Sequence, residues 1–304
     1  MDAPGRFAGI ELGGTKSTAV LAEGHRIIRS STFPTADPRS TLNRLHEQLA
    51  RWHGERPLAA IGIASFGPLQ LRANDPAFGQ MLATPKPGWR GAAVAAELTS
   101  GLVCPWQIDT DVNAAALAEY LWGSATGCQS VCYITIGTGV GGGLVVGGQT
   151  VHGAMHPEIG HLRLRRRNGD PFAGTCPFHG DCVEGLVSGP ALAARFGMAA
   201  DTIPDDDPRW HDVAADMAEL VTTLLLTTSA ERILFGGSVS LARAFLLPLV
   251  RDIAIEKVGS YLPFLDPQRA IEIIALAGLG ADAGPLGAIA LAHAAQSAPG
   301  AKGI

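Results

Sequence analysis

Four potential metal ligands occur close together in the middle of the chain. Cys176, His179 and Cys182 follow one another at intervals of three residues, and His161 lies upstream in the same glycine-rich region. Thiolate and imidazole groups are preferred ligands of Zn²⁺, and four protein ligands leave no position for water, so this spacing predicts a structural zinc site. His156 is an alternative first ligand. The competing interpretation is that these are free cysteines in a loop, or a disulfide, which a reducing compartment disfavours.

Three glycine-rich turns each follow an apolar, strand-like segment. They are Gly13-Gly14-Thr15-Lys16, Gly137-Thr138-Gly139 with glycines continuing to Gly143, and Gly236-Gly237-Ser238. Glycine lets the backbone approach a phosphate closely, and consecutive N–H groups can then bind an anion. One such turn alone is more often a simple hairpin or strand-to-helix connection. Three of them, each with a hydroxyl residue, favour phosphate binding, although none matches the P-loop pattern.

Two carboxylates stand where a predicted strand ends and a predicted helix begins. Asp109 and Asp111 are followed by Asn113. A carboxylate at this place can accept the proton of a substrate hydroxyl, as the general base of phosphoryl transfer to an alcohol does. Asp and Asn are also favoured helix caps, and we expect one of the two aspartates to be a cap.

Other charged residues surround the predicted zinc loop. Glu158 and Glu184 flank it and could bind sugar hydroxyls, although single surface acids are usually only solvated. A cluster of arginines could steer an anionic nucleotide or form the solvated face of a strand. These arginines are Arg163, Arg165, Arg166 and Arg167.

The elements that must position these residues alternate between strand-like and helix-like patterns, which is typical of an α/β protein. A strand, a glycine-rich loop, a strand, a turn and a strand occur at residues 10–33 and again at 133–151. This repetition predicts two duplicated halves that face one another across a cleft. Asp37 and Pro38 predict the start of a helix that ends near Gly54. Residues 271–276 are expected to form a strand.

Composition excludes several classes of protein. Of 304 residues, 47% are hydrophobic and 17% charged, so disorder is excluded as the main state. The net charge of −5 argues against binding to nucleic acids. No apolar run approaches the roughly 20 residues of a membrane helix, and the start of the chain does not have the pattern of a signal peptide. Five cysteines in a long chain favour a reducing compartment, so we expect a cytoplasmic protein.

Taken together, these motifs resemble the ROK family (repressors, uncharacterised reading frames and sugar kinases) of the actin–hexokinase–Hsp70 superfamily. The resemblance extends from about Gly9 to the final helix. It rests on Ile10-Glu11-Leu12-Gly13-Gly14-Thr15-Lys16, Ile136-Gly137-Thr138-Gly139-Val140-Gly141, Phe235-Gly236-Gly237, Asp111-Val112-Asn113 and Glu158-Ile159-Gly160-His161. It implies a two-lobed actin-like (ribonuclease H-like) ATPase fold. The smaller lobe would comprise residues 1–115, with a C-terminal helix at 284–304 packing back on it. The larger lobe would comprise residues 116–283, with a zinc loop at 153–185.

The fructokinase branch of the family is the most similar. Its motifs resemble Ser65-Phe66-Gly67-Pro68, Thr84-Pro85-Lys86-Pro87-Gly88-Trp89, His156-Pro157-Glu158 and the segment from Cys176 to Gly185. His179 stands where the broader family has a cysteine, as in the fructokinase-like members. Glu11 stands where much of the superfamily has an aspartate near the metal.

The resemblance implies an ATP-dependent hexose kinase that converts D-fructose to fructose 6-phosphate. Asp111 would be the catalytic base. ATP with Mg²⁺ would be bound by Glu11, Gly13, Gly14, Thr15, Lys16, Gly137, Thr138, Gly139, Gly236 and Gly237. The sugar would be bound by Gly67, Pro68, Asp111, Asn113, Glu158, His161 and Glu184. Structural Zn²⁺ would be held by His161, Cys176, His179 and Cys182.

Two alternatives remain open. The first is the same chemistry on mannose, glucose or another hexose, because sugars that differ in one hydroxyl are not distinguished by motifs. The second is a non-catalytic sugar sensor, against which the presence of Asp111 and both phosphate loops argues. The family's repressors carry a DNA-binding domain before the first phosphate loop, and we expect none here. The resemblance also implies a homodimer, with no nucleic-acid or membrane partner.

Overall fold

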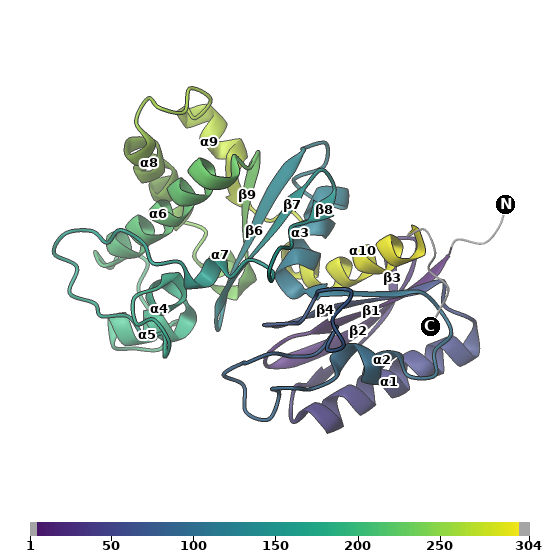
Figure 1. Cartoon of the computed structure of the whole chain (residues 1–304). Helices are drawn as coiled ribbons and strands as arrows, with labels where there is room; N and C mark the ends of the chain where they lie inside the picture. Colours follow the sequence, from purple (N-terminus) through teal and green to yellow (C-terminus); the bar gives the residue numbers. More distant parts are fainter. Residues whose placement is uncertain (1–4, 298–304) are drawn as a thin grey trace. The chain divides into compact units, whose positions relative to one another are not determined.

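The computed structural model describes residues 5–297, which divide into two compact α/β units (Figure 1). Unit 1 comprises the described residues of Met1–Leu121 and Asp282–Ile304 together with Gln149–Pro157. Unit 2 comprises Trp122–Gly148 and Glu158–Ala281. The last part of the expected C-terminal helix, residues 298–304, lies outside the described residues.

Unit 1 is built on a five-stranded sheet with the order β3-β2-β1-β4-β5. Its strands are β1 (Arg6–Leu12), β2 (Lys16–Glu23), β3 (Arg26–Pro34), β4 (Ala60–Ser65) and β5 (Trp106–Thr110). The first three form an antiparallel meander, whereas β1, β4 and β5 run parallel. Its helices are α1 (Pro38–Glu55), α2 (Val94–Thr99), α3 (Asp111–Trp122) and α10 (Ala283–Ser297).

Two helical layers cover the two faces of this sheet. Figure 1 shows α1 and α2 on one face and α10 on the other. The apolar side of α1, which includes Leu42, Leu45 and Leu49, packs with alternate residues of β1 in one buried cluster. Asp37 caps α1 as predicted, since its side chain accepts a hydrogen bond from the Ser40 N–H at 3.0 Å. The helix ends at Glu55, one residue beyond the expected Gly54.

The other face of the sheet is lined by small residues that bring α10 close. A Cβ atom at Gly62 would lie 1.9 Å from the Ala288 carbonyl oxygen and 2.6 Å from the Ala292 nitrogen. At Gly9, a Cβ would lie 2.8 Å from the Ala288 side chain. The backbone of α10 therefore packs directly on β1 and β4, and the contact depends on glycine in both strands.

The second sheet repeats this topology with the order β10-β9-β6-β7-β8. Four of its strands belong to unit 2: β6 (Ser130–Ile136), β7 (Val140–Val146), β9 (Arg232–Gly236) and β10 (Ile274–Leu276). The two-residue edge strand β8 (Gln149–Thr150) is counted with unit 1. β6 pairs antiparallel with β7 and parallel with β9, which in turn runs parallel to β10. Both sheets thus place a hairpin-linked set of strands beside parallel strands, and the predicted α/β fold with duplicated halves is confirmed.

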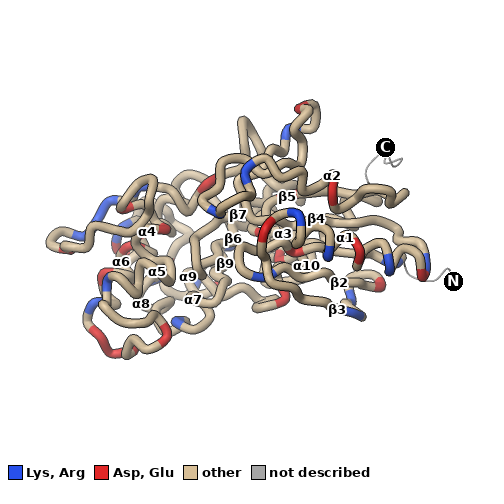
Figure 2. Tube along the Cα trace, turned by 90° about the horizontal axis from the view of Figure 1, so that it is seen from below, with Lys and Arg blue, Asp and Glu red and all other residues tan. Residues whose placement is uncertain are grey.

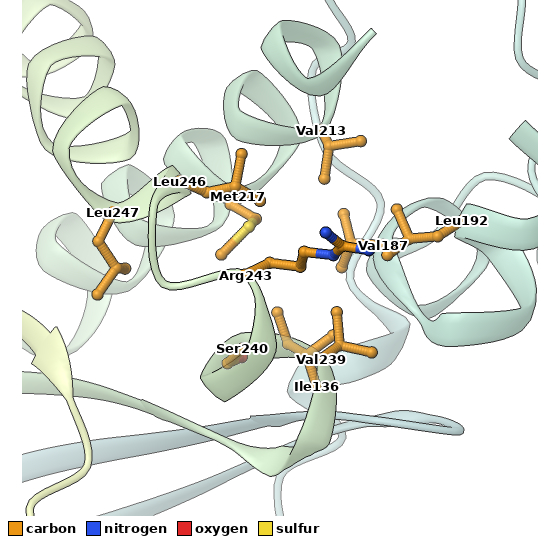
Figure 3. A pocket seen from close by; sticks show the side chains of 10 residues that line it. All are labelled: Ile136, Val187, Leu192, Val213, Met217, Val239, Ser240, Arg243, Leu246 and Leu247. Atoms are coloured by element: carbon orange, nitrogen blue, oxygen red, sulfur yellow. The ribbon is translucent and has the colours of Figure 1, made fainter. Parts of the chain in front are cut away.

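The helices of unit 2 form its main apolar core together with the sheet. They are α4 (Val183–Val187), α5 (Gly189–Phe196), α6 (Trp210–Thr228), α7 (Gly237–Ala242), α8 (Leu246–Val258) and α9 (Pro267–Ile273). Short 3₁₀ turns occur at Ile159–His161 and Gly280–Asp282. Figure 3 shows a cavity of about 10 Å³ in this core, lined mostly by aliphatic side chains such as Leu192 and Met217. As it stands, it has room for one water molecule at most.

Two predicted elements of unit 2 differ from the structure. The glycine-rich loop is restricted to residues 137–139, because residues 141–143 continue β7 and pair with β6. Gly142 is needed there because a Cβ would lie 2.7 Å from the Ile159 side chain. The strand expected at 271–276 begins only at 274. Asp266 accepts hydrogen bonds from the Gln268 and Arg269 N–H groups and so starts α9 before it.

The charged residues lie interspersed along both units (Figure 2). Three of the clustered arginines form ion pairs: Arg163 with Asp181, Arg166 with Asp170, and Arg167 with Asp212. The segment that carries them is irregular, so the expectation of a solvated strand face was wrong. Within residues 5–297, the helices are all too short or too polar to span a bilayer.

The packing of α10 on the sheet predicts opposite effects of alanine at two glycines. Gly62→Ala should destabilise the protein by about 2–3 kcal/mol, because the new methyl group meets the α10 backbone, which cannot rotate away. Gly54→Ala should stabilise it by about 0.5–1 kcal/mol, since Gly54 lies within α1 with open space around its Cα. Urea unfolding of both variants measures the difference. Equal stability of the two variants would refute the described packing.

Candidate functional site

The carboxyl ends of three parallel strands gather the predicted residues of unit 1. Leu12 pairs with Ser65, and Ser65 pairs with Thr110, so β1, β4 and β5 end at the same level. Ligands of open α/β sheets bind at this edge, because the loops that follow the strands meet there. The predicted residues that follow these strand ends are Gly13, Gly14, Gly67, Pro68, Asp111 and Asn113.

The first glycine-rich turn is a hairpin connection between β1 and β2. The Gly13 N–H donates to the Lys16 carbonyl at 3.1 Å, while Gly14, Thr15 and Lys16 are exposed. Lys86 braces this turn by donating from Nζ to the Gly14 carbonyl at 2.6 Å. From the sequence, Lys86 was expected only as part of the motif Thr84–Trp89, without a role of its own. The turn therefore offers exposed backbone and a hydroxyl on a supported frame, as a phosphate site requires.

Glu11 lies on the face of the sheet that carries α10. A Cβ at Gly284 would lie 2.1 Å from the Glu11 Oε1 atom, so the carboxylate stands at the first turn of α10. Burial raises the pKa of Glu11, and the charge of Lys16 partly opposes this shift. The site thus holds a carboxylate whose ionised form is disfavoured by its surroundings.

Asp111 is the first residue of α3, and neither aspartate is the helix cap. The Thr110 hydroxyl accepts a hydrogen bond from the Asn113 N–H at 3.2 Å, which is the usual N-cap contact. Asp111 Oδ1 accepts a hydrogen bond from the N–H of its neighbour Val112, at 2.9 Å. The expectation that Asp109 or Asp111 caps α3 was therefore wrong, and the cap does not require the Asp111 carboxylate.

Asp109 and Asn113, two residues before and two residues after Asp111, form a buried pair. Both side chains are fully buried, and Asn113 Nδ2 donates to Asp109 Oδ1 at 2.9 Å. Thr150 and His152 also donate to this carboxylate. Reasoning from sequence did not identify this network, because Thr150 and His152 lie about 40 residues further along the chain and match no motif.

His156 supports the loop that contains Gly67 and Pro68. Its Nε2 atom accepts a hydrogen bond from the Leu69 N–H at 3.0 Å, and the side chain is buried. Burial lowers the pKa of His156, which keeps the ring neutral as this contact requires. His156 is therefore occupied in unit 1, and it does not belong to the group of possible metal ligands.

The two glycine-rich turns of unit 2 lie side by side at the ends of β6 and β9. Gly237 has a φ of +83°, and a Cβ there would lie 2.5 Å from the Ile136 carbonyl oxygen. Only glycine fits this position, because it combines a left-handed backbone with a close approach to β6. The Gly137 N–H donates to the Gly139 carbonyl at 2.9 Å, and Thr138 at the tip is exposed.

Glu158 and Glu184 lie near this turn in unit 2. Glu184 Oε2 accepts a hydrogen bond from the Val140 N–H at 3.1 Å, which ties its carboxylate to the end of the turn. Burial, and secondly the charge of Glu184, raises the pKa of Glu158 to about 7. Together the carboxylates of Glu158 and Glu184 can accept hydrogen bonds from several hydroxyl groups.

His161, Cys176, His179 and Cys182 come together as the sequence spacing predicted. Their candidate ligand atoms all lie within 4.8 Å of one another. His161 Nδ1 lies 3.8 Å from Cys176 Sγ and 3.6 Å from Cys182 Sγ, and His179 Nδ1 lies 3.8 Å from Cys176 Sγ. Tetrahedral Zn²⁺ with ordinary bond lengths separates nitrogen and sulfur ligands by about 3.5 Å. The donor types and their spacing therefore fit zinc.

A tight backbone arrangement holds these ligands. Cys176 and Gly180 exchange two backbone hydrogen bonds, at 3.1 and 2.9 Å, which fold the intervening residues into a turn. Gly185 of α4 packs on this turn, since a Cβ there would lie 1.9 Å from the Gly180 carbonyl oxygen. The helix that contains Glu184 is thus joined directly to the ligand cluster.

Comparison with known proteins agrees with this arrangement. The chain is 40% identical over 294 residues to a fructokinase of Zymomonas mobilis, covering 95% of this chain and 96% of that protein. It is 37% identical to a fructokinase of Pediococcus pentosaceus, covering 94% and 97%. The crystal structure of a ROK hexokinase from Thermus thermophilus superposes with a TM-score of 0.75 at 27% identity, covering 95% and 98%.

The family assignment follows from the length of the match. Residues 7–295 match the ROK family, which is nearly the whole chain. The resemblance inferred from the motifs is thereby confirmed, and the chain belongs to the ROK family.

Proposed function

We propose that this protein is an ATP-dependent hexose kinase whose substrate is D-fructose. The observation that carries the proposal is the position of Asp111, an acid at the first turn of α3 whose carboxylate the cap does not require. The similarity to fructokinases, at 37–40% identity over nearly the full length, supports fructose as the sugar. The likeness to a ROK hexokinase structure supports the reaction class.

Asp111 is the proposed general base. It accepts the proton of the sugar hydroxyl while the phosphoryl group is transferred to that oxygen. The hydrogen bond from the Val112 N–H fixes one carboxylate oxygen and so orients the other. Little covalent chemistry is required of the protein, because this transfer depends mainly on alignment and neutralisation of charge.

Each unit contributes its own proposed ATP-binding residues. In unit 1, the backbone of Gly13 and Gly14, with Thr15 and Lys16, binds phosphate oxygens. In unit 2, Gly137, Thr138 and Gly139 bind phosphate, and Gly236 and Gly237 allow the nucleoside to approach the backbone. Mg²⁺ bound with ATP would neutralise phosphate charge. Glu11 fits contact with such a cation, since its partly buried carboxylate lacks a compensating charge strong enough to restore its ordinary pKa.

The proposed sugar-binding residues also come from both units. Unit 1 provides Gly67, Pro68 and Asn113 besides Asp111. Unit 2 provides Glu158, Glu184 and His161. Their carboxylates can accept hydrogen bonds from sugar hydroxyls, and their amide and imidazole groups can donate or accept.

Zinc is proposed to be structural, with His161, Cys176, His179 and Cys182 as its ligands. His161 faces the cluster with Nδ1. Its Nε2 atom, on the opposite edge of the ring, is the proposed sugar contact, so zinc would fix the ring's tautomer and orientation. A homodimer, a cytoplasmic location and the lobe boundaries at residues 115 and 283 complete the proposal as the family resemblance implies them.

Replacement of the proposed base gives the most direct test. Asp111→Asn should lower kcat by about 10²- to 10⁴-fold, because the amide cannot accept the hydroxyl proton. Binding of the sugar should persist, because the amide keeps a hydrogen-bonding oxygen. ADP release is measured with ATP, Mg²⁺ and a panel of D-fructose, D-mannose and D-glucose.

Asp252→Asn, at an exposed position of α8, is the matched control and should retain wild-type turnover. Wild-type turnover by Asp111→Asn would remove Asp111 from the role of base. Activity confined to mannose or glucose would replace fructose as the substrate. No activity with any sugar, from folded and zinc-loaded protein, would refute the kinase proposal.

Glu11→Gln should separate stability from activity. The raised pKa of Glu11 means that the folded chain binds this proton more tightly than the unfolded chain. Ionisation therefore costs stability as pH rises above about 4.5, the usual pKa of a glutamate. In the absence of Mg²⁺ and ATP, Glu11→Gln should be more stable than wild type at pH 8, with the difference shrinking towards pH 4.5. Its turnover should fall.

Urea unfolding at several pH values, beside turnover at pH 8, measures both effects. Glu47→Gln, on the exposed side of α1, is the control and should show neither effect. A Glu11→Gln variant less stable than wild type at pH 8 would contradict the assigned environment of Glu11.

Zinc removal should loosen one defined part of unit 2. We expect metal analysis to find about one zinc per chain, as four protein ligands imply. Cys182→Ser should lose it and lower the Tm by about 5–10 °C, which corresponds to about 3 kcal/mol in a protein of this size. Limited proteolysis should then cleave within residues 162–182. Cys128→Ser, outside the cluster, should keep its zinc and its Tm. Unchanged Tm after proven zinc removal would contradict a structural role.

A further inference from the structure

The carboxylate of Asp109 organises a buried network at the end of β5. The side chain has no exposure to solvent, yet it accepts four hydrogen bonds. The donors are the Thr110 N–H at 2.7 Å, Thr150 Oγ1 at 2.8 Å, Asn113 Nδ2 at 2.9 Å and His152 Nε2 at 3.0 Å. These donors compensate the cost of burying a negative charge.

The network fixes which nitrogen of His152 carries a proton. An ionised carboxylate can only accept hydrogen bonds, so the ring must donate from Nε2 to Asp109. The contact between His152 Nε2 and Asn113 Nδ2 at 3.3 Å then joins two donors and is only a packing contact. The hydrogen bond to Asp109 also raises the pKa of His152, against the opposing effect of burial. His152 is therefore held in one orientation with its Nε2 edge inward.

The His152 ring is partly exposed to solvent. The His152 side chain is 34% exposed, in contrast to the fully buried Asp109 beneath it. Within residues 5–297, no hydrogen bond engages His152 Nδ1, because both recorded contacts of the ring are made by Nε2. The ring packs against Asn113 and bonds to the residue two positions before Asp111. An oriented, partly exposed imidazole thus contacts Asn113, a proposed sugar residue in the first turn of α3.

We propose that His152 is a further sugar-binding residue, which hydrogen-bonds a substrate hydroxyl through Nδ1 while Asp109 acts as its positioning residue. A hydroxyl suits either state of the ring, because it can donate to a neutral Nδ1 and accept from a protonated one. That the ligand is a sugar rests on the proposed function, whereas the geometry of His152 and Asp109 does not depend on it.

A purely structural role makes a different prediction from this one. Thr150 and His152 both connect the segment 149–157 to the same carboxylate, so either loss would disturb a structural network in a similar way. Only His152 adds a partly exposed ring with a second nitrogen next to Asn113. Thr150→Val is therefore the matched control for His152→Phe, which keeps the shape of the ring and removes both nitrogens.

The test measures equilibrium binding of D-fructose by calorimetry without ATP, together with the KM values for fructose and ATP. His152→Phe should weaken fructose binding about 10- to 100-fold, as expected for loss of one hydrogen bond in a polar site. Its KM for ATP should stay within about twofold of wild type. Thr150→Val should change the Kd for fructose by less than about threefold. Urea unfolding establishes that both variants are folded.

Each outcome bears on a definite statement. Wild-type fructose affinity in His152→Phe, or equal weakening in Thr150→Val, would overturn the sugar-binding role. Wild-type protein that binds fructose through His152 yet releases no ADP would refute the kinase proposal and support this inference. Wild-type protein that binds none of D-fructose, D-mannose and D-glucose would overturn both. If His152→Phe does not fold, His152→Gln, whose amide can still donate to Asp109, replaces it with the same criteria.

Discussion

The parallel pairing of β1, β4 and β5 determines where the proposed functional residues of unit 1 lie. Because Leu12, Ser65 and Thr110 are paired in one register, the chain leaves the sheet three times at the same edge. The turn at 13–16, the loop with Gly67 and Pro68, and the first turn of α3 then follow at neighbouring places. A shift of one residue in β5 would turn Asp109 to the other face and dismantle its network. Strand register is therefore a condition for the chemistry as much as for the fold.

This register depends in turn on the close packing of α10. The helix lies on β1 and β4 at a distance that only glycine at positions 9 and 62 permits, and its own small residues complete the contact. The same packing positions Glu11, whose carboxylate stands at Gly284 in the first turn of α10. The end of the chain thus sets the environment of an acid near its beginning. Glycine and alanine in these segments allow the helix to pack closely on the sheet, a role separate from that of glycine in turns.

The features that could be predicted from the sequence are those whose interacting residues lie close together along the chain, or whose residue pattern is typical of one structure. The duplicated strands, the Asp37 cap and the four clustered metal ligands all depend on short spacings. The Thr110 cap, the brace from Lys86 and the His152–Asp109 pair were not predicted, because distant segments or a competing cap decide them. The helix α9 takes up the first part of the strand expected at 271–276, because Asp266 satisfies the first N–H groups of the helix. This outweighs the β-propensity of the isoleucines that follow. The arginine cluster was misinterpreted since its acidic partners, such as Asp212, lie far along the chain.

Two carboxylates of unit 1, those of Asp109 and Glu11, differ in how their negative charge is compensated. Asp109 is saturated by four protein donors, so it needs no ligand and can orient a neighbouring ring. Glu11 is partly buried with only the charge of Lys16 to oppose desolvation, and no hydrogen bond to its carboxylate occurs within residues 5–297. Such a carboxylate binds a cation more favourably than a fully hydrogen-bonded one does, because part of its desolvation cost has already been incurred on folding. Asp109, the proposed positioning residue, thus has all its hydrogen bonds from the protein. Glu11, which would contact the cation bound with ATP, has none in the described part of the chain. The difference arises from the neighbours that surround each carboxylate.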